Sequence, residues 1–469
     1  MASFVQQSTM TRLTKRMRPL DDSGQDDAKG DGGENDSSTL EGKAVKMDAQ
    51  TLNGNDADVQ DSNNTPLHHD DQQLGNLQSA IFSIGYKKLQ GKNWTDADHH
   101  LLDQIKDNPF IDLRPPLARY IAHILQNKLA DDDMYRLKLS LSGIVNTMSS
   151  IDFDHIRPFL TTQHLNERLD TTVTQFRNQA LIKDTETLLQ QVIDKFEQSG
   201  SIEETIVLVH DLQRPLLLSK QCTSQAYRAL DATVAILKFM GSYHNTDTEA
   251  NVLRRFMTVL SCIFNNNTNI KLVEGETTSA CTKRIQRVNQ ALYETRQSQS
   301  WGRKIDILVK HDQGNSEFIE LSSLEVKPAS AGVAVVKEQQ NKNLRTNGAI
   351  LSYLSSLNPS CRALQTTAAI DFVGAAGYVY IMANIDGIFY ARQVGLIMLP
   401  KSRSTFVDLI KTLDLLFAFE TFMVNLGQEA QAALERRESL DNICEVVNVA
   451  QENTPSMDHG IYITPTRHK

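Results

Sequence analysis

Two apolar stretches follow each other in the chain, and each carries charged side chains. They are WGRKIDILVK at 301–310 and FIELSSLEVK at 318–327. Their alternation of side chains predicts two strands of one sheet. A charge facing a hydrophobic core is costly, because the group loses its hydration. A fold that contains both strands must therefore provide a polar site for Asp306, Glu325 and Lys327.

The alternation also predicts how these three side chains face. Glu325 and Lys327 are two residues apart and share one face of their strand, while Leu324 points to the other. Asp306 points away from the face of its apolar neighbours. If the two strands are neighbours, the three side chains meet at one end of a sheet. Two carboxylates beside a lysine predict a site for Mg²⁺ or Mn²⁺ next to a substrate phosphate.

Such a site suits a reaction of water at a phosphate group. The main-chain carbonyl of Val326 is a further candidate ligand. A divalent ion lowers the pKa of a bound water and stabilises charge that builds up on a phosphate. Lys327 would position that water or stabilise the transition state.

The order of these residues resembles the PD-(D/E)XK nuclease superfamily. Asp306 is followed by Glu325-Val326-Lys327, and then by a predicted helix with Gln339-Gln340. The sequence pattern GRKID…SLEVK…QQNKNLRTNGAIL is also similar to that of a group of proteins abundant in mucoralean fungi. The resemblance covers roughly residues 270–400. It implies an α/β (α+β) restriction-endonuclease-like core and a metal-dependent nuclease that hydrolyses nucleic-acid phosphodiesters.

The resemblance also implies roles for single residues. Asp306 and Glu325 would bind the metal, Lys327 would assist the water, and Gln339 or Gln340 would orient it.

The first helix of the family core often supplies a further acidic residue. The candidates here are Glu276, just before the predicted helix 278–297, and Glu294, near its end. We prefer Glu276 as the third metal ligand. The proline that commonly precedes the family's aspartate is replaced by Ile305.

Plainer interpretations remain open at this stage. Asp306 and Lys327 would alternatively form an ordinary salt bridge at a sheet edge. Gln339 and Gln340 would alternatively lie on a solvated helix face. The alternative function is a catalytically silent nuclease fold that serves as a nucleic-acid or protein interaction module. A helical adaptor with a purely structural C-terminal half is a third interpretation.

Basic residues near the predicted site favour a nucleic-acid partner, because lysine and arginine bind phosphates independently of sequence. A solvated basic helix face is the competing explanation. No helix-turn-helix, zinc-finger or RNA-recognition signature is present, so sequence specificity is not predicted. The predicted nucleic-acid contacts are Lys283, Arg284, Arg287, Arg303, Lys304, Asn343 and Arg345.

The rest of the chain divides by its patterns. Residues 76–265 show helical spacing and predict an all-α domain of unassigned function. Residues 266–452 hold the nuclease-like pattern and end in a closing helix, 404–426, that we expect Ser404 to cap. Residues 453–469 are predicted to be a flexible tail.

The formal net charge of −9 is unevenly distributed. Residues 1–20 carry +4 and residues 21–75 carry −11, so the remainder is close to neutral and compatible with an anionic partner. The segment 1–75 is acidic and poor in aromatic residues, which predicts disorder. Its basic cluster TKRMRP at 14–19 matches a weak nuclear-import signal or is simply solvated charge.

Composition also bounds the location. The sequence contains no run of 18 or more apolar residues, so we predict no membrane-spanning helix. The first residues also lack the apolar core of a signal peptide. The five cysteines follow neither a zinc-binding nor a disulfide pattern, which is typical of a reducing compartment. We therefore expect an intracellular protein without a membrane partner, located in the nucleus if the basic cluster acts as an import signal.

Overall fold

The fold is given by a computed structural model that describes most of the chain from residue 69 onwards. The predicted disordered segment up to residue 68 and its basic cluster lie outside the described residues, as does Glu294. The described residues are 69–447, apart from 108–115, 128–129, 161–163, 179–180, 245, 266, 268, 294–302 and 315–316, together with 461–462.

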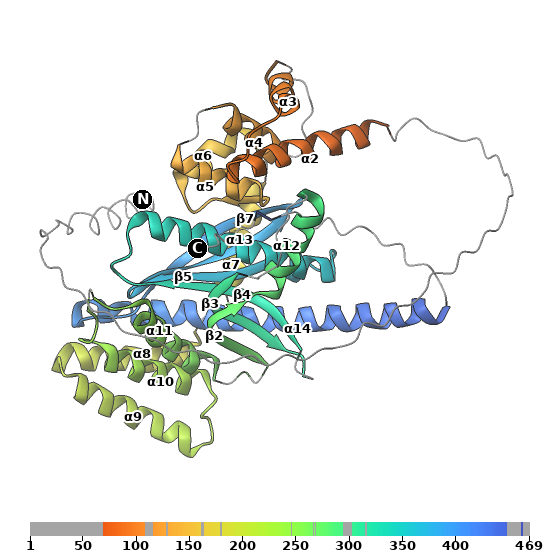
Figure 1. The fold of residues 1–469 in the computed structure, drawn as a ribbon. Helices are drawn as coiled ribbons and strands as arrows, with labels where there is room; N and C mark the ends of the chain where they lie inside the picture. The colour runs from red at the N-terminus through yellow and green to blue at the C-terminus, as the bar shows by residue number, and fades with distance from the viewer. Residues whose placement is uncertain are drawn as a thin grey trace, which may run out of the picture. The chain divides into compact units, whose positions relative to one another are not determined.

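A mixed sheet lies at the centre of residues 65–469, which form one unit (Figure 1). Within the described residues it has seven strands in the order β1-β7-β6-β5-β4-β3-β2. The pairs β4–β5 and β1–β7 are parallel, and the others are antiparallel. The strands are β1 (Ile144–Asn146), β2 (Ile270–Thr278), β3 (Lys304–Asp312), β4 (Phe318–Lys327), β5 (Thr366–Val373), β6 (Ala376–Ile385) and β7 (Ile388–Met398).

Helices cover both faces of this sheet, which confirms the predicted α/β class. None of those that the structure describes is long and apolar enough to cross a membrane. The α-helices are α2 (His69–Leu89), α3 (Asp96–Asp107), α4 (Pro116–Gln126), α5 (Asp131–Ser140), α6 (Ser150–Ile156), α7 (Leu165–Arg177), α8 (Lys183–Ser199), α9 (Ile202–Leu218), α10 (Gln225–Phe239), α11 (Glu249–Phe264), α12 (Ala280–Tyr293), α13 (Val333–Leu357) and α14 (Leu409–Val447). Short 3₁₀-helices are η1 (Arg157–Phe159), η2 (Arg362–Gln365) and η3 (Arg403–Asp408).

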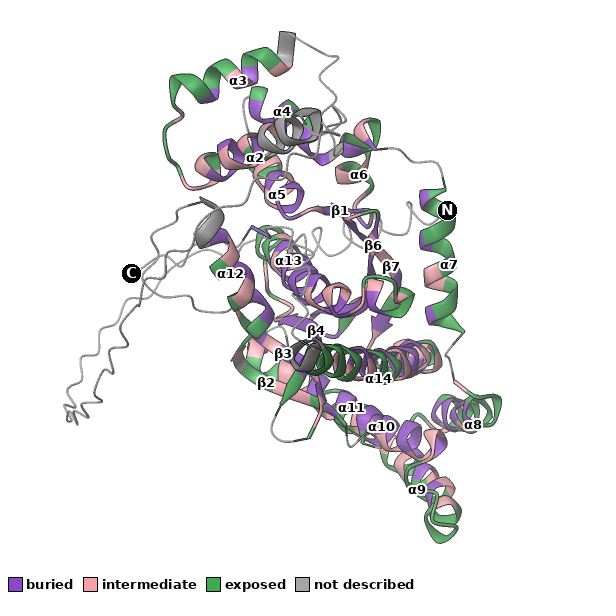
Figure 2. Ribbon diagram, turned by 90° about the vertical axis from the view of Figure 1, so that its right-hand side faces the viewer, coloured by how far each residue is buried: buried purple, intermediate pink, exposed green. Residues whose placement is uncertain are grey.

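Helix α13 crosses one face and joins the parallel strands β4 and β5, as parallel pairing requires. It is buried along most of its length, whereas α9 keeps a broad exposed face (Figure 2). Gly348 lets α13 approach β1 closely, since a Cβ there would meet the Ile144 side chain at 3.0 Å. Asn347 turns its amide to β4, where it accepts from Ser323 N at 2.9 Å and donates to Ser323 O at 2.9 Å.

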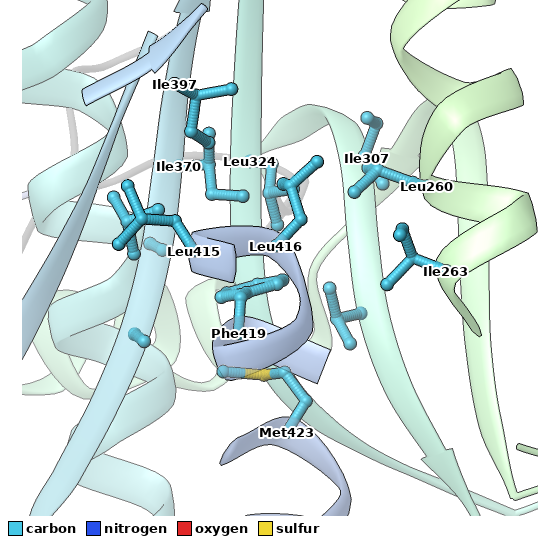
Figure 3. Close-up of a cluster of buried hydrophobic side chains, with 14 of the residues drawn as sticks. Leu260, Ile263, Ile307, Leu324, Ile370, Ile397, Leu415, Leu416, Phe419 and Met423 are labelled. Atoms are coloured by element: carbon cyan, nitrogen blue, oxygen red, sulfur yellow. The ribbon is translucent and has the colours of Figure 1, made fainter. Parts of the chain in front are cut away.

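Helix α14 covers the opposite face with an apolar stripe at helical spacing. Leu416, Phe419 and Met423 follow each other at intervals of three and four residues, and all three are fully buried. They pack towards Leu324 of β4 and Ile370 of β5 (Figure 3). Residues that neighbour these two along their strands, Glu325 and Asp371, therefore face α13 instead.

The predicted closing helix begins and ends differently. A 3₁₀-helix occupies residues 403–408, and α14 runs from Leu409 to Val447. Ser402, not Ser404, is the residue before the first turn, and it is paired with Thr405 in a capping box. Ser404 lies inside that turn, where its side chain lies 3.0 Å from the Ser402 hydroxyl.

The predicted boundary at residue 265 does not separate two units. Strand β1, from the helical half, pairs in parallel with β7. Phe256 of α11 stacks on Phe372 of β5 with ring centroids 4.3 Å apart. The helices and the sheet share hydrophobic cores, because each element alone would leave its apolar face in water.

The predicted tail 453–469 is ordered at its two described residues. Ile461 is 0% exposed and Tyr462 is 2% exposed. Apolar side chains of this size gain enough from burial to hold the backbone in place. The expectation of a flexible tail is therefore wrong at these positions.

Candidate active site

Three carboxylates stand side by side on neighbouring strands beneath α13. Strands β3 and β4 pair with Ile307 opposite Leu324, which puts Asp306 opposite Glu325 at the next position. Strands β4 and β5 pair with Glu325 beside Asp371. Laterally paired residues share a face of a sheet. The fold therefore brings Asp306 and Glu325 together, as predicted, and adds Asp371.

Glu325 is the most deeply buried member of this row, with 1% exposure. Lys342 Nζ of α13 lies 2.7 Å from its Oε1 as an ion pair, and among the described residues neither carboxylate oxygen accepts a hydrogen bond of good geometry. Burial raises the pKa of Glu325 to about 7; Lys342 opposes this rise and Asp306 adds to it. The side chain can therefore gain or lose a proton near neutral pH.

Asp306 and Lys327 lie within ion-pair distance at the ends of their strands. Asp306 Oδ2 accepts a hydrogen bond from Val326 N at 2.8 Å and lies 3.8 Å from Lys327 Nζ. Lys327 Nζ also donates to Val326 O at 3.0 Å and to Glu249 Oε2 at 2.8 Å. Burial disfavours the charged form of Lys327, but Glu249 and Asp306 outweigh it and raise the lysine pKa.

Glu249 is an acidic residue that sequence reasoning missed. It begins α11, directly after Thr248, whose side chain caps the helix by accepting from Asn251 N. The additional acidic residue was instead expected at Glu276, just before the predicted helix; it lies in β2, and its side chain is outside the described part of the structure. Capping marks the start of α11 in the sequence, but only the tertiary fold brings Glu249 to Lys327.

The two glutamines of α13 differ in their surroundings. Gln340 is fully engaged: Nε2 donates to Tyr378 Oη at 2.7 Å, and Oε1 accepts from Asn146 Nδ2 at 3.4 Å. Gln339 is 4% exposed, and neither end of its amide has a hydrogen-bond partner in the part of the chain described. It lies one helical turn before Asn343, on the face that meets the sheet. Gln339 is thus the better candidate for a residue that orients water.

Asp371 anchors a hydrogen-bonded network beneath the helix. It accepts from Tyr378 Oη at 2.6 Å and from Asn343 Nδ2 at 2.9 Å. Burial raises its pKa to about 6, opposed by these two hydrogen bonds. A single carboxylate inside the apolar strand TTAAIDFV is the signal that could have revealed it.

The predicted nucleic-acid contacts fall into two groups. Lys283 and Arg287 are exposed on α12, and Lys304 is exposed at the start of β3. Arg284 is partly buried, with its guanidinium 5.7 Å from the Tyr353 ring centre.

The remaining three predicted contacts are engaged inside the protein. Asn343 and Arg345 are 0% and 3% exposed, so in this conformation neither side chain is at the surface. Their helix face meets the sheet and the chain's own Tyr462 rather than solvent. Arg303 is partly buried and donates to Lys342 O at 3.0 Å, so its guanidinium also holds the fold together.

The candidate site offers carboxylate oxygens, the ligands that hard divalent ions prefer. Within the described residues, no three His, Cys, Asp or Glu side chains form a group that could hold a metal by themselves. Mg²⁺, however, usually keeps several waters and takes one or two carboxylates. Asp306 and Glu325 meet this smaller requirement, because they supply two carboxylates and the oxygens of Glu325 accept no hydrogen bond among the described residues.

Comparison with known proteins leaves this geometry as the evidence for function. No protein-family model, curated protein or solved structure matches the chain significantly. The functional assignment therefore depends on the residues at the ends of β3 and β4 and on the helices that pack over them.

Proposed function

We propose that this protein is a metal-dependent nuclease that hydrolyses nucleic-acid phosphodiesters, with a restriction-endonuclease-like arrangement around β3 and β4. One observation carries the proposal. Asp306 stands opposite Glu325 across two paired strands, and Lys327 Nζ lies 3.8 Å from Asp306 Oδ2. The resemblance of these residues to the PD-(D/E)XK pattern supports the same conclusion.

Each residue has a role that its surroundings favour. Asp306 and Glu325 would hold Mg²⁺ or Mn²⁺, which supplies charge stabilisation and a more acidic water when bound. Lys327 is kept positive by Glu249 and Asp306, so it suits stabilisation of a developing negative charge. Gln339 would hydrogen-bond the attacking water through its uncommitted amide.

The nucleic-acid partner is inferred from cations near the same sheet edge. Lys304 begins β3 two residues before Asp306, and Lys283 and Arg287 are exposed on the preceding helix. Side chains of this kind bind phosphates without reading bases. The proposal is therefore a nuclease without sequence specificity.

One observation favours a catalytically silent binding module instead. Lys342 and Glu249 already supply opposite charges to Glu325 and Lys327 at 2.7 Å and 2.8 Å. Internal pairs of this kind stabilise a polar cluster without any ligand. On this alternative, the chain would bind nucleic acid or protein and turn nothing over.

A cleavage assay separates the two functions. Single- and double-stranded DNA and RNA would be incubated with the protein in Mg²⁺, Mn²⁺ or EDTA. The informative variants are Asp306→Asn and Lys327→Met. The matched control is Asp312→Asn, at the far end of the same strand β3.

The nuclease proposal expects cutting that requires a divalent ion. We expect a loss of about 100-fold or more in both site variants, since several kcal/mol of transition-state stabilisation would be removed. The Asp312→Asn variant should cut normally. Retained binding with no cutting by the unaltered chain would favour the silent module.

A further inference from the structure

The dipeptide Ile461–Tyr462 is seated between two hydrophobic cores. Ile461 belongs to the core shared by the sheet and α14, whereas Tyr462 belongs to the core of the N-terminal helices. The Tyr462 ring meets Tyr86 of α2 edge-on, with ring centroids 5.3 Å apart. Its backbone N donates to Ser142 Oγ at 3.0 Å. This short segment thus occupies a built, specific position.

Two guanidinium groups converge on the carbonyl oxygen of Tyr462. Arg303 donates to it at 3.0 Å and Arg345 at 2.9 Å. The other acceptors of the Arg303 guanidinium among the described residues are the Lys342 carbonyl and the Thr346 hydroxyl, so all of these acceptors are neutral. Burial and mutual repulsion lower the pKa of Arg303 well below its usual value.

This arrangement is better matched to an anion than to a carbonyl. Two cations that point to one oxygen repel each other, and a neutral acceptor offsets that repulsion only weakly. Phosphate oxygens accept forked arginine hydrogen bonds more strongly than neutral oxygens do. The position of the Tyr462 oxygen therefore has the chemistry of a phosphate site.

The position also lies beside the carboxylate row. Arg303 precedes Asp306 by three residues, and the residue whose carbonyl it binds, Lys342, contacts Glu325 through its ammonium group. Arg345 follows Lys342 by three residues, close to one turn of α13. A phosphate held by the two arginines would thus lie at the sheet edge where β3 begins.

We propose that Arg303 and Arg345 form a second phosphate-binding position, that the Tyr462 carbonyl fills it in this conformation, and that a phosphate of the substrate displaces Tyr462 when it binds. The identification of that phosphate as a nucleic-acid phosphate rests on the proposed function. The binding itself does not, because it requires neither metal nor cleavage.

Hydrogen exchange of the full chain tests the displacement directly. Exchange at Tyr462 N would be followed by mass spectrometry in EDTA, with inorganic phosphate or with chloride at equal ionic strength. We expect at least tenfold faster exchange in phosphate than in chloride. Equal rates in the two salts would overturn the proposal, because screening alone would then explain any release.

A second arm removes the competing carbonyl. A chain that ends at residue 452 should bind inorganic phosphate at least tenfold more tightly than the full chain, and a synthetic peptide of residues 455–469 should compete. Arg345→Gln should abolish this binding, whereas Arg362→Gln, at an exposed arginine of η2, should not. A folded shortened chain that binds no phosphate contradicts the proposal. If shortening prevents folding, the exchange experiment decides alone.

A short oligonucleotide without terminal phosphates distinguishes the two sources of phosphate. If it also accelerates exchange at Tyr462 in EDTA, the position accepts a phosphodiester. If only inorganic phosphate acts, the substrate part of the proposal is wrong. If the protein cuts no nucleic acid but phosphate still accelerates exchange at Tyr462, the result contradicts the nuclease function. It does not contradict the phosphate-binding position.

Discussion

The ammonium group of Lys342 lies 2.7 Å from a carboxylate oxygen of Glu325, so α13 places a cation directly against the most buried acid of the sheet. The lysine side chain is 34% exposed, whereas that of Glu325 is 1% exposed. Lys342 can therefore swing towards solvent, but Glu325 cannot. The charge of the candidate site depends on whether this lysine, a proton or a bound cation compensates Glu325.

Replacing Glu325 with glutamine should change the pH dependence of stability. The pKa of Glu325 is raised from 4.5 to about 7 in the folded chain, so its contribution to stability is lost as pH rises from 4.5 to 7. The shift corresponds to roughly 3 kcal/mol. Urea unfolding at pH 5 and pH 8 should show a smaller decrease for Glu325→Gln than for the unaltered chain.

The exposed Glu338→Gln change on the same helix is the control and should leave the decrease unaltered. Asp371, whose pKa is raised to about 6, adds a decrease of the same sign at lower pH that both variants keep. An identical pH profile for Glu325→Gln and the unaltered chain would show that Glu325 is not a buried titrating group.

Replacing Lys342 with methionine should destabilise the fold more at pH 8 than at pH 5. Loss of the ammonium leaves a buried carboxylate without its cation, and Glu325 escapes this cost only by taking up a proton. We expect a loss of about 2–4 kcal/mol at pH 8 and markedly less at pH 5 by urea unfolding. Lys337→Met removes a surface pair with Asp132 and should cost less than about 1 kcal/mol at either pH. Equal losses for the two variants would contradict the argument.

Local signals predicted several elements of the fold correctly. The apolar alternation of 301–310 and 318–327 predicted both β3 and β4. Asp386 and Gly387 form the turn between β6 and β7, where both have positive φ, and an Asp-Gly pair is a local signal for such a turn. Helix α4 begins at Pro116, and proline is a local signal for the first position of a helix. By contrast, no local pattern shows that β1 joins the sheet beside β7, since its partner lies more than 240 residues away.

Strand alternation predicted only the part of the candidate site that lies on β3 and β4. Asp306 and Glu325 share a face because paired strands require it. Asp371 and Glu249 arrive from other elements, and only the packing of β5 and α11 brings them near. Asn343 was predicted as a nucleic-acid contact because it lies on a polar helix face, whereas in the structure that face meets buried polar groups of the sheet.

Removing the hydroxyl of Tyr378 should weaken the network beneath α13. This hydroxyl donates to Asp371 at 2.6 Å and accepts from Gln340 at 2.7 Å. Tyr378→Phe removes one of the two hydrogen bonds that the buried Asp371 accepts and leaves Gln340 Nε2 without its acceptor, so we expect a loss of about 1–3 kcal/mol in urea unfolding. Tyr135→Phe, at a partly exposed ring on α5, should cost far less. If Tyr378→Phe left the free energy of unfolding unchanged, a water molecule would have replaced the hydroxyl.

Gly427 should not tolerate even a methyl group. A Cβ at this position of α14 would overlap the ring of His311, a buried residue of β3, whose Cγ would lie 2.9 Å away. Gly427→Ala should therefore cost about 1–3 kcal/mol despite the better helix propensity of alanine. Gln428→Ala, the exposed neighbour, is the control and should be neutral or slightly stabilising. Thermal unfolding of the two variants provides the comparison, and a Gly427→Ala protein as stable as the control would show that His311 moves aside freely.

Divalent cations should stabilise the folded chain in a pH-dependent way. Binding of Mg²⁺ requires Glu325 to lose its proton, and its pKa of about 7 makes that costly in acid. We expect Mg²⁺ at about 100 times its dissociation constant to add roughly 3 kcal/mol at pH 8 and clearly less at pH 5.5. Unfolding with Mg²⁺ or EDTA measures this difference without any nucleic acid. Asp306→Asn and Glu325→Gln should abolish it, whereas Asp312→Asn should retain it. Stabilisation that is equal in all four proteins would show that the ion acts elsewhere on the surface, and the carboxylates of β3 and β4 would then serve the fold alone.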